Sequence, residues 1–423
     1  MQCSEWNTII EQIDVISGGA RSNAGSKLQP ITIKQSITQD NKRLASGIPE
    51  FDTVLGGGIV AGSVNLIAGQ PGIGKSTLLL QLAYALSSKV KVLYVSGEES
   101  AHQIGLRAQR LGASNDKLNI VTSNSADNIA ATIAAGEAQM VVVDSIQTLA
   151  CQDISSAAGT VSQITNSTQL ITAAAKASNT AVIIVGHVTK EGYIAGPKVL
   201  EHAVDVVLQL EGDRYGGFKL LRAIKNRFGP TTETGIFEMN DKGMMPVKNP
   251  SAALLSERQV SDGSIVLATM EGTRPLLVEV QALVNRTSFG YPKRAASGFD
   301  LNRLNLLIAM LERRSKLKLS ESDIYINIVG GMQIKDPAAD LAICLAIGSA
   351  AKGYQLNKNL AVFGETGLSG EIRHASYAER RIAEAKKLGF SGAIGPKSQP
   401  TVKIAGLYAV SDVRSALNQF LDK

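Results

Sequence analysis

Nine consecutive residues, 69–77, have the types and spacing of a phosphate-binding loop. The glycines let backbone N–H groups converge on phosphate oxygens, and Lys75 reaches the β- and γ-phosphates of a nucleoside triphosphate. The hydroxyl of Ser76 is a ligand for Mg²⁺. An ordinary glycine turn is the alternative, but the lysine, the hydroxyl and both flanking segments favour a site for ATP and Mg²⁺. In order, the residues are Gly69, Gln70, Pro71, Gly72, Ile73, Gly74, Lys75, Ser76 and Thr77.

A second nucleotide signal lies downstream, where the apolar run 138–143 ends in Asp144. This is the Walker B pattern, whose carboxylate orients Mg²⁺ beside the phosphates. Taken alone, the pattern also fits an aspartate that caps the next turn. Together with the upstream loop it favours the catalytic interpretation, so we expect Mg²⁺ to be held through Ser76 and Asp144.

Two glutamates, Glu98 and Glu99, follow another apolar run, 91–97. A carboxylate just beyond a neighbouring strand can polarise an attacking water, and ligands of open α/β sheets bind at strand ends. Alternatively, both glutamates begin the helix near Ser100, where the helix dipole favours acidic side chains. Spacing alone does not decide between these interpretations.

A fourth apolar run, 181–186, ends at His187. A polar side chain at this strand end is placed to sense the γ-phosphate. A single histidine is more often structural than catalytic, so the structural alternative stays open for His187.

These candidates need a sheet whose strands all end at one edge. Apolar strands alternate with helical stretches from residue 46 onward, which predicts a parallel α/β sheet. Pro250 disfavours helix just before it and indicates a linker. The predicted organisation is a flexible lead-in at 1–45, an ATPase domain at 46–247, a linker at 248–259 and a second α/β domain at 260–423.

Composition narrows the class of protein. The chain has 423 residues, 44% of them apolar, but contains no apolar run of the ~18–20 residues that span a membrane. Its first residues lack the pattern of a signal peptide. Three widely spaced cysteines argue against a disulfide framework, so we expect a cytoplasmic protein. The net charge of +6 permits an anionic partner such as nucleic acid.

Together these motifs resemble the RecA-type ATPase core, and the finer match is to the bacterial RadA (Sms) family of DNA-repair ATPases. The resemblance runs from about residue 40 to the C-terminus. Its most specific element is the pentapeptide Lys225-Asn226-Arg227-Phe228-Gly229. Further matching stretches are residues 44–58, 94–100, 186–192 and 200–205.

Lys225 and Arg227 alternate on an extended segment, so both cations should point to one face. A solvated strand end is the usual place for such a pair. The resemblance implies more: in related ring ATPases, such a pair reaches the γ-phosphate bound by the neighbouring subunit, as an arginine finger does. Contact with a DNA phosphate is the other role that it allows.

One departure from the family concerns zinc. RadA proteins normally begin with a four-cysteine zinc module, and Cys3-Ser4-Glu5-Trp6-Asn7-Thr8 resembles its last fragment. A single thiolate cannot form a closed structural zinc site. We therefore expect no metal site apart from the one for Mg²⁺.

The C-terminal domain resembles the proteolytic domain of Lon, with matches at residues 326–331, 335–340, 363–372 and 385–390. Lon uses a serine nucleophile that a lysine activates. In this chain, Ala338 occupies the serine position and Glu379 the lysine position. The resemblance thus implies a retained Lon-like fold without peptidase activity, used for ring assembly and DNA contact.

Candidate DNA contacts lie in two places. Arg286, Lys293 and Arg294 are interleaved with aromatic residues, a pattern suited to phosphate contact with base stacking. Lys190 and Lys198 lie in one of two segments, 152–163 and 189–198, where RecA-type proteins place DNA-binding loops. A solvated surface is the alternative for each of these residues.

The resemblance implies an ATP-driven DNA motor of homologous recombination, a DNA-dependent ATPase and translocase that forms a ring, expected to be hexameric. Its expected partners are single-stranded DNA, branched recombination intermediates and the RecA recombinase, and its expected outcome is branch migration. A regulatory ATPase similar to KaiC is the alternative, and the pentapeptide at 225–229 counts against it. An ATP-dependent protease is a third possibility, and Ala338 counts against that one.

Overall fold

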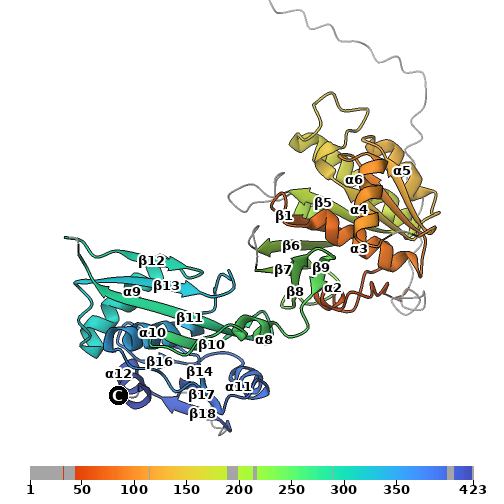
Figure 1. The fold of residues 1–423 in the computed structure, drawn as a ribbon. Coiled ribbons are helices and arrows are strands. Elements are labelled where there is room, and N and C mark those ends of the chain that lie inside the picture. The colour runs from red at the N-terminus through yellow and green to blue at the C-terminus, as the bar shows by residue number, and fades with distance from the viewer. Residues whose placement is uncertain are drawn as a thin grey trace, which may run out of the picture. The chain divides into compact units, whose positions relative to one another are not determined.

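A computed structural model describes residue 32 and residues 43–113, 115–187, 199–212, 217–288, 290–397 and 404–421. The chain divides into two units, Met1–Asn41 and Lys42–Lys423. The first unit contains only Thr32 among the described residues, so the predicted lead-in and its Cys3 fragment lie almost wholly outside them. The second unit contains every helix and strand described below (Figure 1).

The first sheet of the second unit has nine strands in the order β3-β2-β4-β5-β1-β6-β7-β8-β9. The six from β3 to β6 in this order pair in parallel, which confirms the predicted sheet. The next three add in antiparallel fashion, an extension that the alternation of elements did not indicate. Their bounds are β1 (Val64–Gly69), β2 (Val92–Ser96), β3 (Leu118–Thr122), β4 (Met140–Asp144), β5 (Ala181–His187), β6 (Val206–Gly212), β7 (Phe218–Asn226), β8 (Thr234–Asn240) and β9 (Gly243–Pro246).

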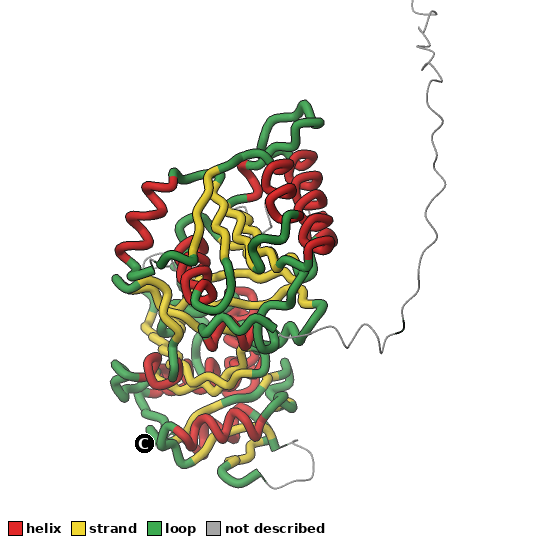
Figure 2. The backbone as a smooth tube through the Cα atoms, turned by 90° about the vertical axis from the view of Figure 1, so that its right-hand side faces the viewer, coloured by secondary structure: helices red, strands yellow, loops and turns green. Residues whose placement is uncertain are grey.

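Helices cover both faces of this sheet (Figure 2). Side chains alternate along β1, so Ile67 joins the apolar cluster with α3 while Leu66 joins the cluster with α5 and α6. Because both faces are covered, every residue of β1 is buried, as parallel sheets require. The helices are α2 (Pro49–Val54), α3 (Lys75–Ser87), α4 (Ala101–Arg110), α5 (Ala126–Ala134), the 3₁₀ turn η1 (Ile146–Thr148), α6 (Val161–Ser178) and α7 (Val199–Ala203).

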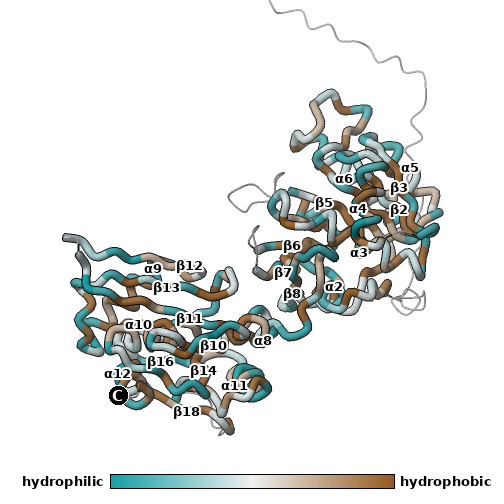
Figure 3. The backbone as a smooth tube through the Cα atoms, in the orientation of Figure 1, coloured by the Kyte–Doolittle hydropathy of each residue, from teal (hydrophilic) through white to brown (hydrophobic). Residues whose placement is uncertain are grey.

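The second sheet, in the C-terminal domain, has seven strands in the order β12-β13-β11-β10-β14-β17-β18. Its core is built on α10, of which ten consecutive residues from Asp340 are buried. Apolar stretches follow the strands of both sheets (Figure 3). The strands are β10 (Ser264–Glu271), β11 (Arg274–Arg286), β12 (Arg294–Ser297), β13 (Ser322–Ile328), β14 (Leu360–Val362), β17 (Gly392–Pro396) and β18 (Leu407–Val410), with a separate pair β15 (Glu365–Thr366) and β16 (Ile372–Arg373).

The helical elements of this domain are α9 (Leu301–Met310), the π-helical turn η2 (Leu311–Ser315), the 3₁₀ turn η3 (Pro337–Ala339), α10 (Asp340–Lys352), α11 (Ala378–Lys387) and α12 (Val413–Phe420). No helix within the described ranges is long and apolar enough to cross a membrane.

The segment interpreted as a linker, 248–259, contains a short helix, α8 (Pro250–Leu255). The side chain of Asn249 caps it by accepting a hydrogen bond from the backbone N–H of Ala252 at 3.1 Å. Pro250 occupies the first helical turn, where its missing N–H costs nothing. Proline thus starts a helix here, and the domain boundaries stay predictions.

Candidate nucleotide site

The loop between β1 and α3 has the backbone of an anion cradle. Gly72 (φ +79°) and Gly74 (φ +111°) adopt left-handed conformations that favour glycine. A Cβ on Gly74 would also lie 2.5 Å and 2.6 Å from the terminal methyl carbons of Met239 and Met244. The first N–H groups of α3 have no partner within the helix and face the loop with partial positive charge. The geometry therefore fits phosphate oxygens.

Lys75 is buried, with 4% of its surface exposed. Its Nζ donates to the carbonyl oxygens of Gly69 at 2.8 Å and Gln70 at 3.1 Å, and lies 3.2 Å from Nδ1 of His187. Burial lowers the pKa of this lysine to about 8, although the charges of Asp144 and Glu98 act to raise it. A buried cation whose contacts are neutral groups is well suited to pair with an incoming anion.

Asp144 ends β4 and is 6% exposed. Tyr94 on β2 donates its phenolic proton to Oδ2 of Asp144 at 2.6 Å. Burial, followed by the Asp144 charge, raises the pKa of Tyr94. The alternative role of Asp144 as a helix cap is not seen, since Ser145 is the residue that precedes η1.

The donor set fits Mg²⁺, which prefers oxygen ligands and usually takes only one or two from protein. Asp144 provides a carboxylate and Ser76 a hydroxyl at the second position of α3. In the described ranges, no group of three or more His, Cys, Asp or Glu residues is arranged so that it could hold a metal ion. Phosphate and water would therefore have to supply the remaining ligands.

The two neighbouring glutamates separate in space. Glu98 accepts a hydrogen bond from the hydroxyl of Ser145, and its Oε1 lies 3.4 Å from Nε2 of His187. Glu99 instead pairs with Arg107 of α4. Ser100 caps α4, which starts at residue 101, so both glutamates precede this helix rather than begin it.

His187 joins the cluster from the end of β5, because its ring lies between Lys75 and Glu98. Sequence reasoning found these three residues but missed Tyr94 and Ser145. The signal for Tyr94 is in the register: β2 pairs with β4 so that Ser96 lies opposite Asp144, and Tyr94 lies two residues before Ser96.

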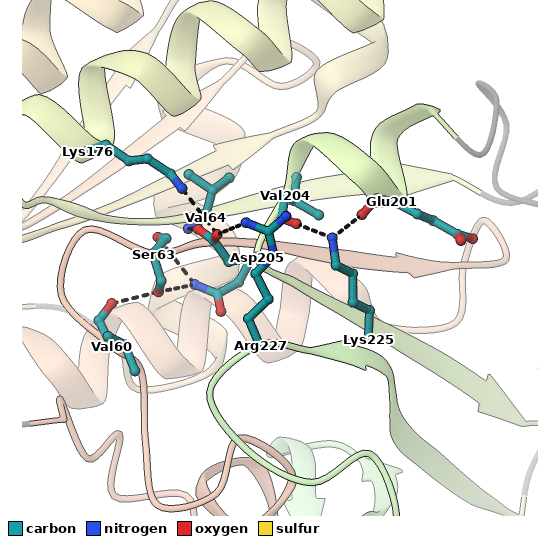
Figure 4. Close-up of polar contacts among 10 residues, drawn as sticks. Val60, Ser63, Val64, Lys176, Glu201, Val204, Asp205, Lys225 and Arg227 are labelled. Carbon is teal, nitrogen blue, oxygen red and sulfur yellow. Dashed lines mark hydrogen bonds and ion pairs between the residues drawn. The ribbon is translucent and has the colours of Figure 1, made fainter.

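Lys225 lies near the end of β7 and Arg227 directly follows the strand; both side chains point to the turn between α7 and β6 (Figure 4). Nζ of Lys225 donates to the carbonyl oxygens of Glu201 at 2.6 Å and Val204 at 2.8 Å. Nη1 of Arg227 donates to Oδ1 of Asp205 at 3.2 Å. Burial, followed by the neighbouring Arg227, lowers the pKa of Lys225. Within this chain, the pair is thus held by its own subunit.

The rest of the pentapeptide forms the turn after β7. The side chain of Asn226 accepts from the N–H of Phe228 at 2.9 Å, and Gly229 lies against the loop at Gly56. Arg43 fastens this turn: its guanidinium donates to the carbonyl oxygens of Leu55 at 2.8 Å, Gly58 at 3.3 Å and Phe228 at 2.5 Å.

The candidate DNA residues of the C-terminal domain lie at the end of β11 and around the start of β12, the two strands on either side of β13. Arg286 ends β11 and Arg294 begins β12, and both strands pair with β13. The Arg286 side chain is 87% exposed and Lys293 is exposed, whereas Arg294 is half-buried and its Nη1 donates to Oδ1 of Asn305 at 3.4 Å. Lys190, Lys198 and the segment around them lie outside the described residues. The structure therefore gathers one of the two predicted groups.

The position matched to the Lon serine carries no reactive group, because Ala338 lies buried in η3. Glu379, at the matched lysine position, is exposed on α11. Beside Ala338, the buried Arg381 donates to Asp336 at 2.6 Å and to the carbonyl oxygen of Ala268 at 2.6 Å. Asp336 in turn accepts from the N–H groups of Met270 and Ala338. Both charged groups of this ion pair therefore already have hydrogen-bond partners within the domain.

Comparison with known proteins identifies relatives along nearly the whole chain. A family model described as an AAA domain matches residues 29–193, and one described as subunit ChlI of Mg-chelatase matches residues 302–399. The DNA repair protein RadA of Aquifex aeolicus (strain VF5) is 44% identical over 417 residues, which cover 98% of this chain and 93% of that protein.

The DNA repair protein RadA of Bacillus subtilis (strain 168) is 48% identical over 401 residues, 93% of this chain and 88% of that protein. Its counterpart in Pseudomonas aeruginosa is 45% identical over 425 residues, 99% of this chain and 93% of that protein. A crystal structure of the RadB recombinase aligns over 48% of this chain and all of its own, with 22% identity and a TM-score of 0.39.

Proposed function

Because the chain belongs to the family of the DNA repair protein RadA, we propose that it is an ATP-driven DNA motor of homologous recombination. The observation that carries the proposal is the cluster of Lys75, His187 and Glu98 beside the glycine loop. A cation for phosphate, a carboxylate for water and a polar group between them are what ATP hydrolysis requires.

Each side chain has a role that follows from its contacts. Lys75 exchanges its carbonyl partners for the β- and γ-phosphate oxygens of ATP. Glu98, held by Ser145 and His187, orients the attacking water and accepts its proton. His187 touches both groups and senses the γ-phosphate. Ser76 and Asp144 would hold Mg²⁺, which would neutralise charge on the phosphates.

The proposal extends to assembly. The chain forms a homohexameric ring in which Lys225 and Arg227 reach the γ-phosphate bound by the next subunit, or a DNA phosphate. Support comes from their position at a strand end and from the half-exposed Arg227 side chain, which one carboxylate holds at 3.2 Å. The ring moves along single-stranded DNA and promotes branch migration together with the RecA recombinase in the cytoplasm.

DNA contact in this proposal uses Arg286, Lys293 and Arg294, at the end of β11 and around the start of β12, together with Lys190 and Lys198. The exposed Arg286 and Lys293 favour contact with a phosphate backbone, and the half-buried Arg294 adds positive charge next to Lys293 in the chain. We propose no peptidase activity, because Ala338 lacks a nucleophilic atom and Arg381 is already paired with Asp336.

The test is the steady-state ATPase rate with and without single-stranded DNA, at saturating ATP and two salt concentrations. Stimulation by DNA, weakening as salt rises, is the expected result because phosphate contacts release counterions. Heparin, a polyanion without bases, is the matched control and should stimulate less. A rate that DNA leaves unchanged would point instead to a regulatory ATPase that acts on a protein partner.

A further inference from the structure

Asp205, just before β6, is a buried carboxylate that links β1, the strand leading into the phosphate loop, to Arg227 of the pentapeptide. It is 3% exposed. Its Oδ2 accepts from the N–H of Val64 at 3.0 Å, and its own N–H donates to the carbonyl oxygen of Val64 at 2.9 Å. Val64 is the first residue of β1, the strand that ends at Gly69 in the phosphate loop. Asp205 is therefore fixed to the strand that positions the phosphate loop.

The other oxygen of this carboxylate has two cationic partners. Nζ of Lys176, in the last turn of α6, and Nη1 of Arg227 each lie 3.2 Å from Oδ1 of Asp205 (Figure 4). The side chains of both cations are about half exposed, at 51% and 52%, while the side chain of Asp205 is 4% exposed. One cation is enough to compensate a single negative charge, so the second is in excess while both remain.

We propose that Lys176 is a stand-in cation, which keeps Asp205 paired when the Arg227 side chain leaves to contact a phosphate outside its own subunit. The inference rests on the proposed function, in which Arg227 acts beyond its subunit. A buried carboxylate left without a cation is costly, so an unaccompanied departure of Arg227 would be opposed. With Lys176 in place, the same movement leaves Asp205 paired.

The backbone supports a movement of the side chain alone. The N–H of Arg227 donates to the carbonyl oxygen of Asp205 at 3.2 Å, so the main chain stays anchored while the guanidinium is free to swing. A guanidinium has five N–H groups, and Nη1 provides the bond to Asp205, which leaves further donors for a phosphate.

The partners of Lys225 differ from those of Arg227, so the proposed role of Lys176 applies to Arg227 alone. Its Nζ donates to two carbonyl oxygens, those of Glu201 and Val204, and to no carboxylate in the part of the chain that the structure describes. Its departure would leave neutral groups that water can satisfy. Lys176 should therefore matter for Arg227 and not for Lys225.

The experiment is a double-mutant cycle on DNA-stimulated ATP turnover by the 423-residue chain. Lys176→Met removes the charge and keeps the stem, and should lower turnover about tenfold, the factor that ~1.4 kcal/mol represents. Lys176→Arg keeps the charge and should stay within about twofold of wild type. Binding of a fluorescent ATP analogue should be unchanged in both variants, because the phosphate loop is untouched.

Asp205→Asn is the second mutation of the cycle. Its amide oxygen can still accept from the N–H of Val64, but the negative charge is gone. In that background Lys176→Met should cost less than about twofold, because no buried charge needs compensation. An equal loss in both backgrounds, or no loss in either, overturns the proposal. If Asp205→Asn fails to fold, the comparison of Lys176→Met, Lys176→Gln and Lys176→Arg decides: equal turnover of all three overturns it.

Arg227→Ala separates this inference from the proposed function. Normal turnover in Arg227→Ala would remove the role of Arg227 itself, and with it the proposed function at this residue. A large loss in Arg227→Ala together with unchanged Lys176→Met would overturn the stand-in role alone.

Discussion

Two buried cations, Lys75 in the ATPase domain and Arg381 in the C-terminal domain, occupy contrasting surroundings. Lys75 contacts two carbonyl oxygens and an imidazole, and its pKa is lowered to about 8. Arg381 donates to Asp336 and to the carbonyl oxygens of Ala268 and Ser376. A buried cation without a directly bonded anion is ready for a ligand, whereas a fully compensated one holds structure. The two surroundings therefore predict different roles, a ligand-binding cation at Lys75 and a structural ion pair at Arg381.

The largest effect expected from this contrast is on Lys75. Lys75→Met should reduce ATP turnover to the rate of the buffer blank, because the phosphates lose their fixed cation. Stability should be unchanged or higher in urea unfolding, because burial of a charged lysine opposes folding at neutral pH. Loss of stability together with activity would show that Lys75 is structural, the role that we expect of Arg381.

The next largest effect should distinguish Glu98 from Glu99. Glu98→Gln should lower turnover about 10²–10⁴-fold, because an amide does not accept the proton of the attacking water. ATP binding, measured with a fluorescent analogue, should remain. Glu99→Gln is the matched control and should retain turnover, because Glu99 pairs with Arg107 away from His187. The opposite pattern would move the catalytic role by one residue.

For the ion pair in the C-terminal domain, Arg381→Met should lower the free energy of unfolding by ~3–5 kcal/mol, because the Asp336 side chain, only 10% exposed, would lose its cation. Arg380→Met, one residue earlier and exposed, is the control and should change it by less than ~1 kcal/mol. Urea denaturation followed by circular dichroism measures both. Equal effects would mean that the buried pair is not what holds this region.

The smallest expected effect is the pH dependence that Lys75 gives to stability. The pKa of Lys75 is about 8 in the folded chain against 10.5 for an ordinary lysine, so between these values the unfolded chain binds more protons. The free energy of unfolding should therefore rise as the pH rises from about 8 to 10.5. Above that range the lysine is neutral in both states, so its charge no longer opposes folding.

ATP reverses that shift, because the phosphates favour the charged lysine. Binding at pH 8.5–9 should take up a fraction of one proton, seen as different calorimetric enthalpies in two buffers of unlike ionisation enthalpy. Lys75→Arg should show no uptake, because a guanidinium stays charged throughout. Buffer-independent enthalpies for the wild-type chain would contradict the lowered pKa.

Much of the nucleotide site could be predicted from the sequence. Asp144 and His187 were found because each directly follows an apolar run and parallel strands end at the same edge of a sheet, whereas Lys75 was found from the spacing of the glycine loop that contains it. The choice between Glu98 and Glu99 was not available, because it depends on where the Ser100 cap starts α4.

Partners distant in sequence were also out of reach. The bond from Tyr94 to Asp144 depends on strand register, and the bond from Arg227 to Asp205 depends on how β7 returns beside β6. In the C-terminal domain, the sequence identified Ala338 as unreactive but gave no sign that Arg381 and Asp336 would form a closed pair beside it.

The three carbonyl bonds of Arg43 have a consequence for proteolysis. Trypsin must draw an arginine side chain into its acidic specificity pocket before it can cut. Arg43 can enter that pocket only after leaving the oxygens of Leu55, Gly58 and Phe228, the last of which belongs to the pentapeptide. The rate of cleavage after Arg43 therefore reports how often this turn opens, and the chain carries its own probe of that motion.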